Sequence, residues 1–255
     1  WHSASGKDFK SFVSTNFTGG DFAPNSVLEG ANIAKTNNPS INFNLHSEKS
    51  IYEKFKPIFS DLFDNSQWTQ SQNFISPDMK PSDALKKDNR NSSMSNAILN
   101  LKEDKNQISI SAGNTGAMMA YSTVYLRTIE NITRPAIASL FPSEKHPVCF
   151  LDLGANAECN SENLLDFAVM GSTYYKVLYP QIDTKVALLN IGSEELKGNN
   201  LIQETHELMK SDKRINYKGF VEADEITSTN NHVIVTDGFS GNIALKTLRE
   251  SPGDP

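Results

Sequence analysis

One pattern recurs along this chain and constrains its fold more than any other feature. A short β-branched run ends in a turn rich in glycine and asparagine, and an amphipathic helical pattern follows. The strand runs of this pattern are 12–15, 108–111, 148–153, 185–191 and 232–236. Strands that alternate with helices in this way are typical of a parallel sheet covered by helices on both faces. We therefore predict the α/β class, with a doubly wound, mostly parallel sheet in an α/β/α sandwich.

The helices expected after these strands can be placed from apolar spacing and capping residues. Pro24 suits the first turn of a helix that carries Val27, Leu28, Ala31 and Ala34 on one face. Further helices are expected at 117–129 and 162–175, the second with Ser161 as its N-cap. Another helix ends near Met209, and a last one begins after the turn 237–242.

The glycine- and asparagine-rich loops all fall where a predicted strand ends. In doubly wound sheets the ligand crevice lies outside the carboxyl ends of the strands, at a point where the strand order reverses. These loops are therefore the candidate ligand site. They are Gly19-Gly20-Asp21, Ala112 to Gly116, Gly154-Ala155-Asn156, Glu194 to Asn199 and Asp237 to Asn242.

Each loop also has a purely structural interpretation. The two glycines of Gly113 to Gly116 fit a tight turn, and they equally fit an anion held by backbone N–H groups at a helix start. Lys197 is either a surface lysine or a point charge for phosphate. Asp237 is either a substrate contact or the acceptor of an Asx-type turn. The residues alone leave these alternatives open.

Composition excludes several classes of function. The chain has 255 residues, with 24 basic and 30 acidic side chains and no Lys/Arg block, so we expect no nucleic-acid partner. It contains neither a dinucleotide fingerprint nor a Walker motif, and its five histidines lack metal-ligand spacing, so we expect no cofactor and no metal. Its apolar runs are too short to span a membrane. Cys149 and Cys159 fit reduced thiols of an intracellular protein.

Eight motifs follow one another between Thr15 and Thr247. They are Gly19 to Pro24, Ser92-Ser93-Met94, Ser111 to Ala117, Arg134-Pro135, Leu151 to Asn156 with Cys159, Met170-Gly171-Ser172, Leu189 to Gly192 with Glu194, Glu195 and Lys197 to Asn199, and Asp237 to Asn242 with Leu245-Lys246-Thr247. In order and spacing they resemble the bacterial-type phosphate acyltransferase family, the acyl-acyl-carrier-protein:phosphate acyltransferases of phospholipid synthesis.

This resemblance implies an activity and a set of partners. Acyl-carrier protein and inorganic phosphate would be converted into acyl-phosphate, which a membrane acyltransferase uses to load glycerol 3-phosphate. It also implies a homodimer in the cytoplasm, or in the plastid stroma of a eukaryote, with peripheral contact to the membrane or to that acyltransferase.

The resemblance further implies roles for particular residues. Lys197 and Asn242 match the family's catalytic lysine and asparagine. The residues implied to bind phosphate or substrate are Gly19, Gly20, Asp21, Gly113, Asn114, Thr115, Gly116, Asn156, Glu195, Asp237 and Gly241.

Two departures from the family pattern limit what the resemblance implies. Asn16 stands where members usually carry aspartate, and Thr18 stands where they usually carry methionine. Members also continue well beyond Thr247, so the C-terminal part is apparently missing. We therefore expect an N-terminal extension at 1–14, an incomplete acyltransferase domain at 15–247 and an atypical tail at 248–255.

Two other functions remain open. The same fold serves phosphate acetyl- and butyryltransferases, which use acyl-coenzyme A. A truncated, inactive relative that only binds partners is the third possibility.

Overall fold

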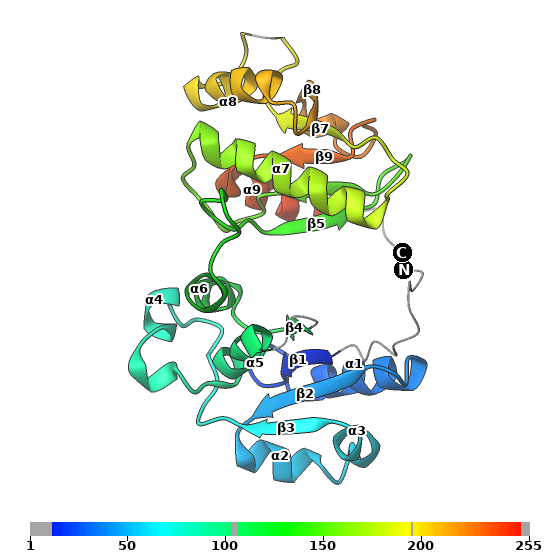
Figure 1. Cartoon of the computed structure of the whole chain (residues 1–255), viewed down its shortest axis with the longest axis vertical. Helices are drawn as coiled ribbons and strands as arrows, with labels where there is room; N and C mark the ends of the chain where they lie inside the picture. The colour runs from blue at the N-terminus through cyan, green and yellow to red at the C-terminus, as the bar shows by residue number, and fades with distance from the viewer. Residues whose placement is uncertain (1–11, 104–106, 195, 251–255) are drawn as a thin grey trace. The chain divides into compact units, whose positions relative to one another are not determined.

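The computed structural model describes residues 12–103, 107–194 and 196–250. The chain forms two compact units, an N-terminal unit (Trp1–Arg127) and a C-terminal unit (Thr128–Pro255). Each unit is built around its own sheet of mostly parallel strands, flanked by helices (Figure 1).

The N-terminal unit contains a four-stranded parallel sheet in the order β3-β2-β1-β4. Its elements are β1 (Phe12–Asn16), α1 (Asn25–Asn37), β2 (Asn42–Ser47), α2 (Lys49–Phe55), α3 (Ser60–Asp64), β3 (Gln67–Gln70), α4 (Pro81–Ala84), the 3-10 turn η1 (Lys87–Asn89), α5 (Ser93–Glu103), β4 (Gln107–Ser111) and α6 (Thr115–Leu126). The chain runs outward from β1 to β3 and then returns to the other side of β1. The strand order therefore reverses between β1 and β4, which is where such sheets form their crevice.

The two faces of this sheet differ in chemistry. On one face, Val13, Phe43 and Leu45 join a buried apolar cluster with α1, α2 and α3. The other face is covered by α5 and is polar, although it is buried. There His46 is hydrogen bonded to the Ser14 hydroxyl at 3.0 Å, and other polar side chains share the layer. The alternation of side chains along a strand explains how one strand supplies both faces.

The C-terminal unit contains a five-stranded sheet in the order β5-β6-β9-β7-β8, in which only β5 is antiparallel to its neighbour. Its elements are β5 (Ala138–Phe141), β6 (Val148–Leu151), α7 (Ser161–Leu178), β7 (Lys185–Leu189), α8 (Asn200–Ser211), β8 (Asn216–Val221), the 3-10 turn η2 (Ala223–Glu225), β9 (Val233–Val235) and α9 (Gly238–Glu250).

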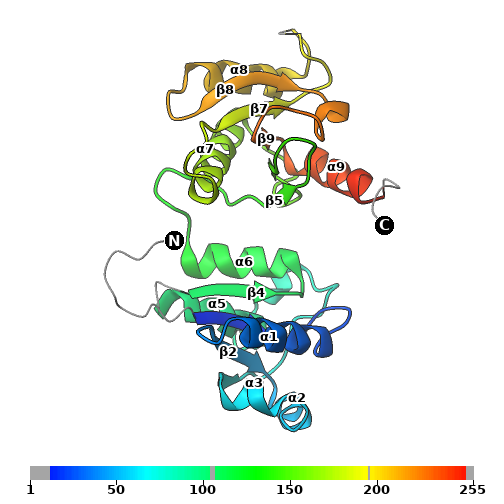
Figure 2. The same ribbon diagram turned by 90° about the vertical axis from the view of Figure 1, so that its right-hand side faces the viewer.

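Both faces of this second sheet are apolar and buried. Alternate residues of β6, β7 and β9, such as Leu151, Leu188 and Val233, pack under α7 and α8. The residues between them, such as Phe150 and Ile234, pack with Ala244 and Leu245 of α9. Figure 2 shows α7 and α9 on opposite sides of these strands. Burial on both faces explains why these strands are nearly continuous apolar runs in the sequence.

The predicted α/β class with parallel strands and flanking helices is confirmed, but the strands are divided between two sheets. Three helices were also misplaced. The helix predicted at 117–129 is α6, which spans Thr115–Leu126. Asn160, and not Ser161, caps α7, because its side chain accepts the Asn163 N–H in a capping box. α9 already begins at Gly238, so the predicted turn 237–242 is the first helical turn.

None of the helices within the described ranges is both long enough and apolar enough to cross a membrane.

The buried side chain of His46 should make the free energy of unfolding depend on pH. Burial lowers its pKa to about 4, below the ordinary value near 6.5. As the pH falls, His46 is protonated in the unfolded chain near pH 6.5 but in the folded chain only near pH 4. The stability that neutral His46 allows above pH 6.5 is therefore lost as the pH falls toward 4. We expect the free energy of unfolding to fall by about 2 kcal/mol between pH 7.5 and pH 5 from this group. Urea titrations of the parent and of His46→Gln at both pH values measure it. An equal loss in the variant would contradict the assignment.

Candidate active site

In the N-terminal unit, the loops that follow β1 and β4 are in close backbone contact. A Cβ atom added to Gly20 would lie 2.7 Å from the carbonyl oxygen of Ala112, and one added to Gly113 would lie 2.6 Å from that of Gly19. Gly19 also has a φ of +88°, which favours glycine. The glycines are therefore required for the two loops to meet where the strand order reverses.

Asn16 holds the turn that leads into this loop. Its buried side chain donates from Nδ2 to the carbonyl oxygen of Thr18 at 2.8 Å. The Thr18 hydroxyl in turn lies 2.8 Å from the Ser93 hydroxyl at the start of α5. An ionised carboxylate at position 16 would have no hydrogen to donate. The amide therefore supplies a donor to this turn that a carboxylate would not supply, while its Oδ1 is buried without a hydrogen-bond partner among the described residues.

Asn114 is occupied by structural contacts. Its Oδ1 accepts the Ala117 N–H at 2.9 Å and so caps α6. Its Nδ2 lies within 3.1 Å of the carbonyl oxygens of Ser76, Pro77 and Met79. The N–H of Gly113 donates to the Ser111 hydroxyl at 3.1 Å. The groups of this loop left for a ligand are therefore chiefly the backbone N–H groups at the start of α6 and the exposed side chain of Thr115.

In the C-terminal unit, a buried carboxylate organises the loop that follows β6. Oδ1 of Asp152 accepts the backbone N–H groups of Ile137, Gly154 and Ala155 at 2.9, 3.2 and 3.0 Å. Oδ2 accepts the backbone N–H and the side-chain amide of Asn156 at 2.7 and 2.9 Å. A buried carboxylate needs such donors to replace water. Asp152 therefore holds the whole loop around itself.

The first turn of α9 packs directly on this loop through glycine. A Cβ atom added to Gly238 would lie 2.7 Å from the carbonyl oxygen of Asn156, and one added to Gly241 would overlap the carbonyl oxygen of Asp152. The side chain of Asn242 lies against Gly154, 3.3 Å from where a Cβ atom would be. The structure thus brings Asn156, Gly241 and Asn242 together, although they are far apart in the sequence.

Asp237 and Asn156 both have structural hydrogen bonds. The carboxylate of Asp237 accepts the backbone N–H and the hydroxyl of Ser240 at 2.8 and 2.9 Å, which caps the start of α9. The Nδ2 of Asn156 donates to the carbonyl oxygen of Pro135 at 2.8 Å as well as to Asp152. Both side chains therefore hold the loops that border the site.

The loop after β7 fixes the backbone of Lys197 and leaves its side chain exposed. The Nδ2 of Asn190 donates to the Lys197 carbonyl oxygen at 3.0 Å, and the Gln203 side chain donates to the same oxygen. Asn199 caps α8 by accepting the Ile202 N–H at 3.0 Å. No carboxylate of the described residues forms an ion pair with Lys197. Glu195, the other charged residue proposed from this loop, lies outside the described residues.

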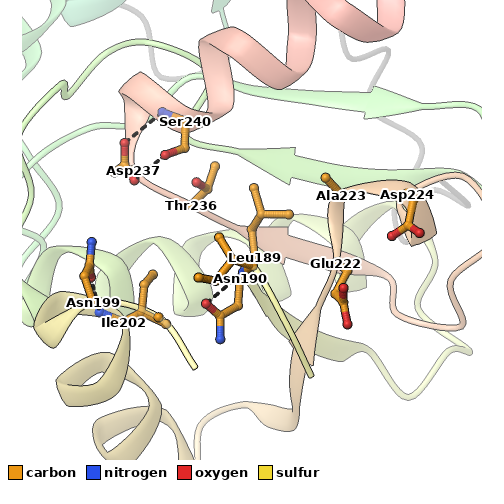
Figure 3. Close-up of a pocket in the computed structure, with 12 residues that line it drawn as sticks. Leu189, Asn190, Asn199, Ile202, Glu222, Ala223, Asp224, Thr236, Asp237 and Ser240 are labelled. Atoms are coloured by element: carbon orange, nitrogen blue, oxygen red, sulfur yellow. Dashed lines mark hydrogen bonds between the residues drawn. The ribbon is translucent and has the colours of Figure 1, made fainter. Parts of the chain in front are cut away.

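A pocket of about 700 Å³ opens at the carboxyl ends of β7, β8 and β9 (Figure 3). Among the described residues, Asp237 is the one individually predicted site residue that lines it, and Gly198, Asn199 and Ser240 come from two of the predicted loops. The full lining is Leu189, Asn190, Ile191, Gly198, Asn199, Ile202, Glu222, Ala223, Asp224, Thr236, Asp237 and Ser240. Sequence reasoning missed Glu222 and Asp224 because β8 does not end in a glycine-rich turn.

The predicted site residues divide between the two units. Those of the N-terminal unit are Gly19, Gly20, Asp21, Gly113, Asn114, Thr115 and Gly116. Those of the C-terminal unit are Asn156, Glu195, Lys197, Asp237, Gly241 and Asn242. Within each unit, those in the described residues lie in loops at the carboxyl ends of strands or in the helix turns that follow them.

Comparisons with known proteins establish the family. A family model described as "Fatty acid synthesis protein" matches residues 12–252. The phosphate acyltransferase of Wolbachia pipientis subsp. Culex pipiens (strain wPip) is 40% identical over 245 residues, which cover 94% of this chain and 71% of that protein. The chain belongs to the phosphate acyltransferase family. The phosphate acyltransferase of Pelagibacter ubique (strain HTCC1062) is also 40% identical, over 92% of this chain and 70% of its own length. The predicted family and the assignment as an acyltransferase enzyme are confirmed.

Solved structures of phosphotransacetylases share the fold of this chain. EutD phosphotransacetylase from Staphylococcus aureus superposes with a TM-score of 0.65 at 15% identity, covering 94% of this chain and 82% of that one. A phosphotransacetylase from Streptococcus pyogenes gives a TM-score of 0.67 at 15% identity, with the same coverage of both chains. At this identity the likeness shows the fold and carries no information on the substrate.

The contact between α9 and the Asp152 loop predicts a large effect of a single methyl group. We expect Gly241→Ala to lower the free energy of unfolding by at least about 2 kcal/mol, because the new Cβ would overlap the Asp152 carbonyl oxygen. The matched control is Gly30→Ala on the exposed side of α1, where an added Cβ meets nothing within 4 Å. That change should stabilise the chain by roughly 0.5–1 kcal/mol. Urea unfolding of both variants tests this, and a neutral Gly241→Ala would contradict the close contact.

Proposed function

We propose that this chain transfers a fatty acyl group from acyl-carrier protein to inorganic phosphate, giving the acyl-phosphate that acylates glycerol 3-phosphate in phospholipid synthesis. The observation that carries the proposal is family membership: the fatty acid synthesis family model matches residues 12–252, and phosphate acyltransferases are 40% identical over more than nine-tenths of the chain. A phosphate oxygen attacks the thioester carbonyl carbon and the C–S bond breaks. The phosphate loses its proton and the carrier thiol gains one.

Lys197 and Asn242 are the proposed catalytic residues. The exposed ammonium group of Lys197 stands on a loop whose backbone is held by Asn190 and Gln203. Among the described residues, no hydrogen bond engages the side chain of Asn242 on α9. An ammonium group and an amide N–H are suitable donors for phosphate and for the oxyanion that develops on the thioester carbonyl. Their roles are electrostatic, and no covalent enzyme intermediate is needed.

The proposed phosphate contacts come mainly from backbone N–H groups of the glycine-rich loops. These donors belong to Gly19, Gly20 and Gly116 of the N-terminal unit. Gly113 and Gly241 are also in the proposed set, but their N–H groups already donate to the Ser111 hydroxyl at 3.1 Å and to the Asp237 carbonyl oxygen at 2.9 Å, so they contribute by letting their loops pack closely. Asn114, Asn156 and Asp237 support them by holding loops, since their side chains are committed to protein partners. Asp21, Thr115 and Glu195 complete the proposed set. Backbone donors of this kind suit anions because they are fixed before the ligand arrives.

The proposed setting follows from the same activity. Acyl-carrier protein and phosphate are the substrates, and a homodimer in the cytoplasm is the proposed form. Since the acyl-phosphate is consumed by a membrane acyltransferase in this scheme, we also propose a peripheral contact with the membrane or with that enzyme.

The choice of acyl donor can be tested directly. The purified chain is incubated with phosphate and either palmitoyl-acyl-carrier protein or palmitoyl-coenzyme A, and acyl-phosphate is trapped with hydroxylamine. We expect a kcat/KM for the carrier protein at least about tenfold higher, equivalent to 1.4 kcal/mol of differential transition-state binding. A higher kcat/KM for palmitoyl-coenzyme A would overturn the assignment of acyl-carrier protein as the donor. If neither donor gives acyl-phosphate, the result would favour the alternative that this chain is an inactive relative that only binds partners.

Lys197→Ala tests the catalytic role of the lysine. Removing one donor at a developing charge commonly costs about 10²–10³ in rate, so we expect a loss of kcat in that range with an unchanged urea midpoint. Lys213→Ala is the matched control, because Lys213 is an exposed lysine of the same unit outside the site loops. If Lys197→Ala keeps wild-type activity, Lys197 is a surface lysine without a catalytic role.

A further inference from the structure

A second cavity adjoins the pocket at the carboxyl ends of β7, β8 and β9. It has a volume of about 330 Å³ and shares Leu189, Ala223 and Ser240 with the larger pocket. Because the two cavities share these three lining residues, they lie next to each other inside the C-terminal unit, and we treat them together as one groove. The groove has two parts, which we call the polar part (about 700 Å³) and the apolar part (about 330 Å³).

The apolar part runs along one face of α9. Ser240, Ile243, Ala244 and Thr247 line it, and their spacing of three and four residues puts them on one side of a helix. Leu189, Ala223 and Ile226 complete the lining. Apart from the hydroxyl groups of Ser240 and Thr247, its side chains are hydrocarbon. An alkyl chain binds to such a lining because the contact removes the apolar surface of the alkyl chain and that of the side chains from water.

The polar part has a different chemistry. Its lining includes the carboxylates of Glu222, Asp224 and Asp237 and the amides of Asn190 and Asn199. Among the described residues that line it, none is a lysine or arginine. A groove lined by one sign of charge disfavours a dianion and accepts neutral groups with N–H and O–H donors. A pantetheine arm, which is neutral and carries amide and hydroxyl groups, fits this description better than phosphate does.

We propose that this groove binds the acyl thioester, with the pantetheine arm in the polar part and the first methylenes of the acyl chain in the apolar part along α9. This inference rests on the proposed function and adds the position of the donor substrate within the C-terminal unit. It assigns Ala223 and Ile243 a role in acyl-chain length, because they face the apolar part from two different elements, η2 and α9.

The test uses a series of S-acyl pantetheines with four, eight, twelve and sixteen carbons. Their binding to the whole chain is measured by calorimetry. Burial of a methylene stabilises by about 0.8 kcal/mol, so the affinity should rise by at most about fourfold per methylene until the apolar part is filled, and then level off. In both Ile243→Trp and Ala223→Leu, the affinity should stop rising at a shorter acyl chain than in the parent. The larger side chain narrows the apolar part of the groove from the solvent side.

Val177→Trp on α7 is the matched control. Val177 is 61% exposed and Ile243 is 53% exposed, but α7 packs on the face of the sheet opposite to α9. The control should leave the chain-length profile unchanged. Urea midpoints of all three variants separate an effect on binding from a loss of fold.

The outcomes separate this proposal from the proposed function. If acyl-phosphate forms but affinity does not depend on chain length, the groove assignment is wrong and the function stands. If chain-length-dependent binding is seen and no donor gives acyl-phosphate, the function fails and the groove stands. If the variants change sedimentation but not acyl-pantetheine binding, the groove is a contact surface between copies of the chain, and the proposal is overturned.

Discussion

Backbone contact between loops, without intervening side chains, is the constraint on which both candidate sites depend. In the N-terminal unit the loops after β1 and β4 approach to a distance that admits no Cβ atom at Gly20 or Gly113. In the C-terminal unit the first turn of α9 meets the loop after β6 in the same way, at Gly238 and Gly241. Loops that touch through the main chain present their N–H groups in fixed positions. The glycines in the motifs therefore serve loop packing first and ligand contact second.

Buried polar side chains keep these loops in place once they have met. Asp152 accepts N–H donors from two segments. Asn114 and Asn190 likewise hold their loops, by donating from their side-chain amides to backbone carbonyl oxygens. Each of these groups would be costly to bury without partners, so the loop conformation and the side chain depend on each other. The exposed Lys197 and the half-buried Asn242 differ from them, since the polar atoms of their side chains form no hydrogen bond within the described residues. This contrast separates the residues that shape the site from those proposed to act on substrate.

Much of the fold was predictable because its signals are local. The apolar runs of β6, β7 and β9 and the periodic helices after them are set by neighbouring residues, and the loops between them were found at the strand ends. The polar groove was not predictable, because Glu222 follows β8 without any turn signature and reaches the pocket only through the order of the strands. The role of Asn190 was hidden for a similar reason. Its two partners are backbone groups of its own loop, and sequence spacing does not show that the loop folds back.

The sequence by itself determined the α/β class, the positions of the glycine-rich loops and the family, because these depend on residue order along one chain. The tertiary structure decided that the strands form two sheets and that Asn156, Gly241 and Asn242 meet at one place. It also decided that Asn114, Asn156 and Asp237 hold loops. The physical reason is that hydrogen-bond partners and close backbone contacts arise between segments far apart in the sequence. Their pairing is set by strand order and packing, which no local pattern encodes.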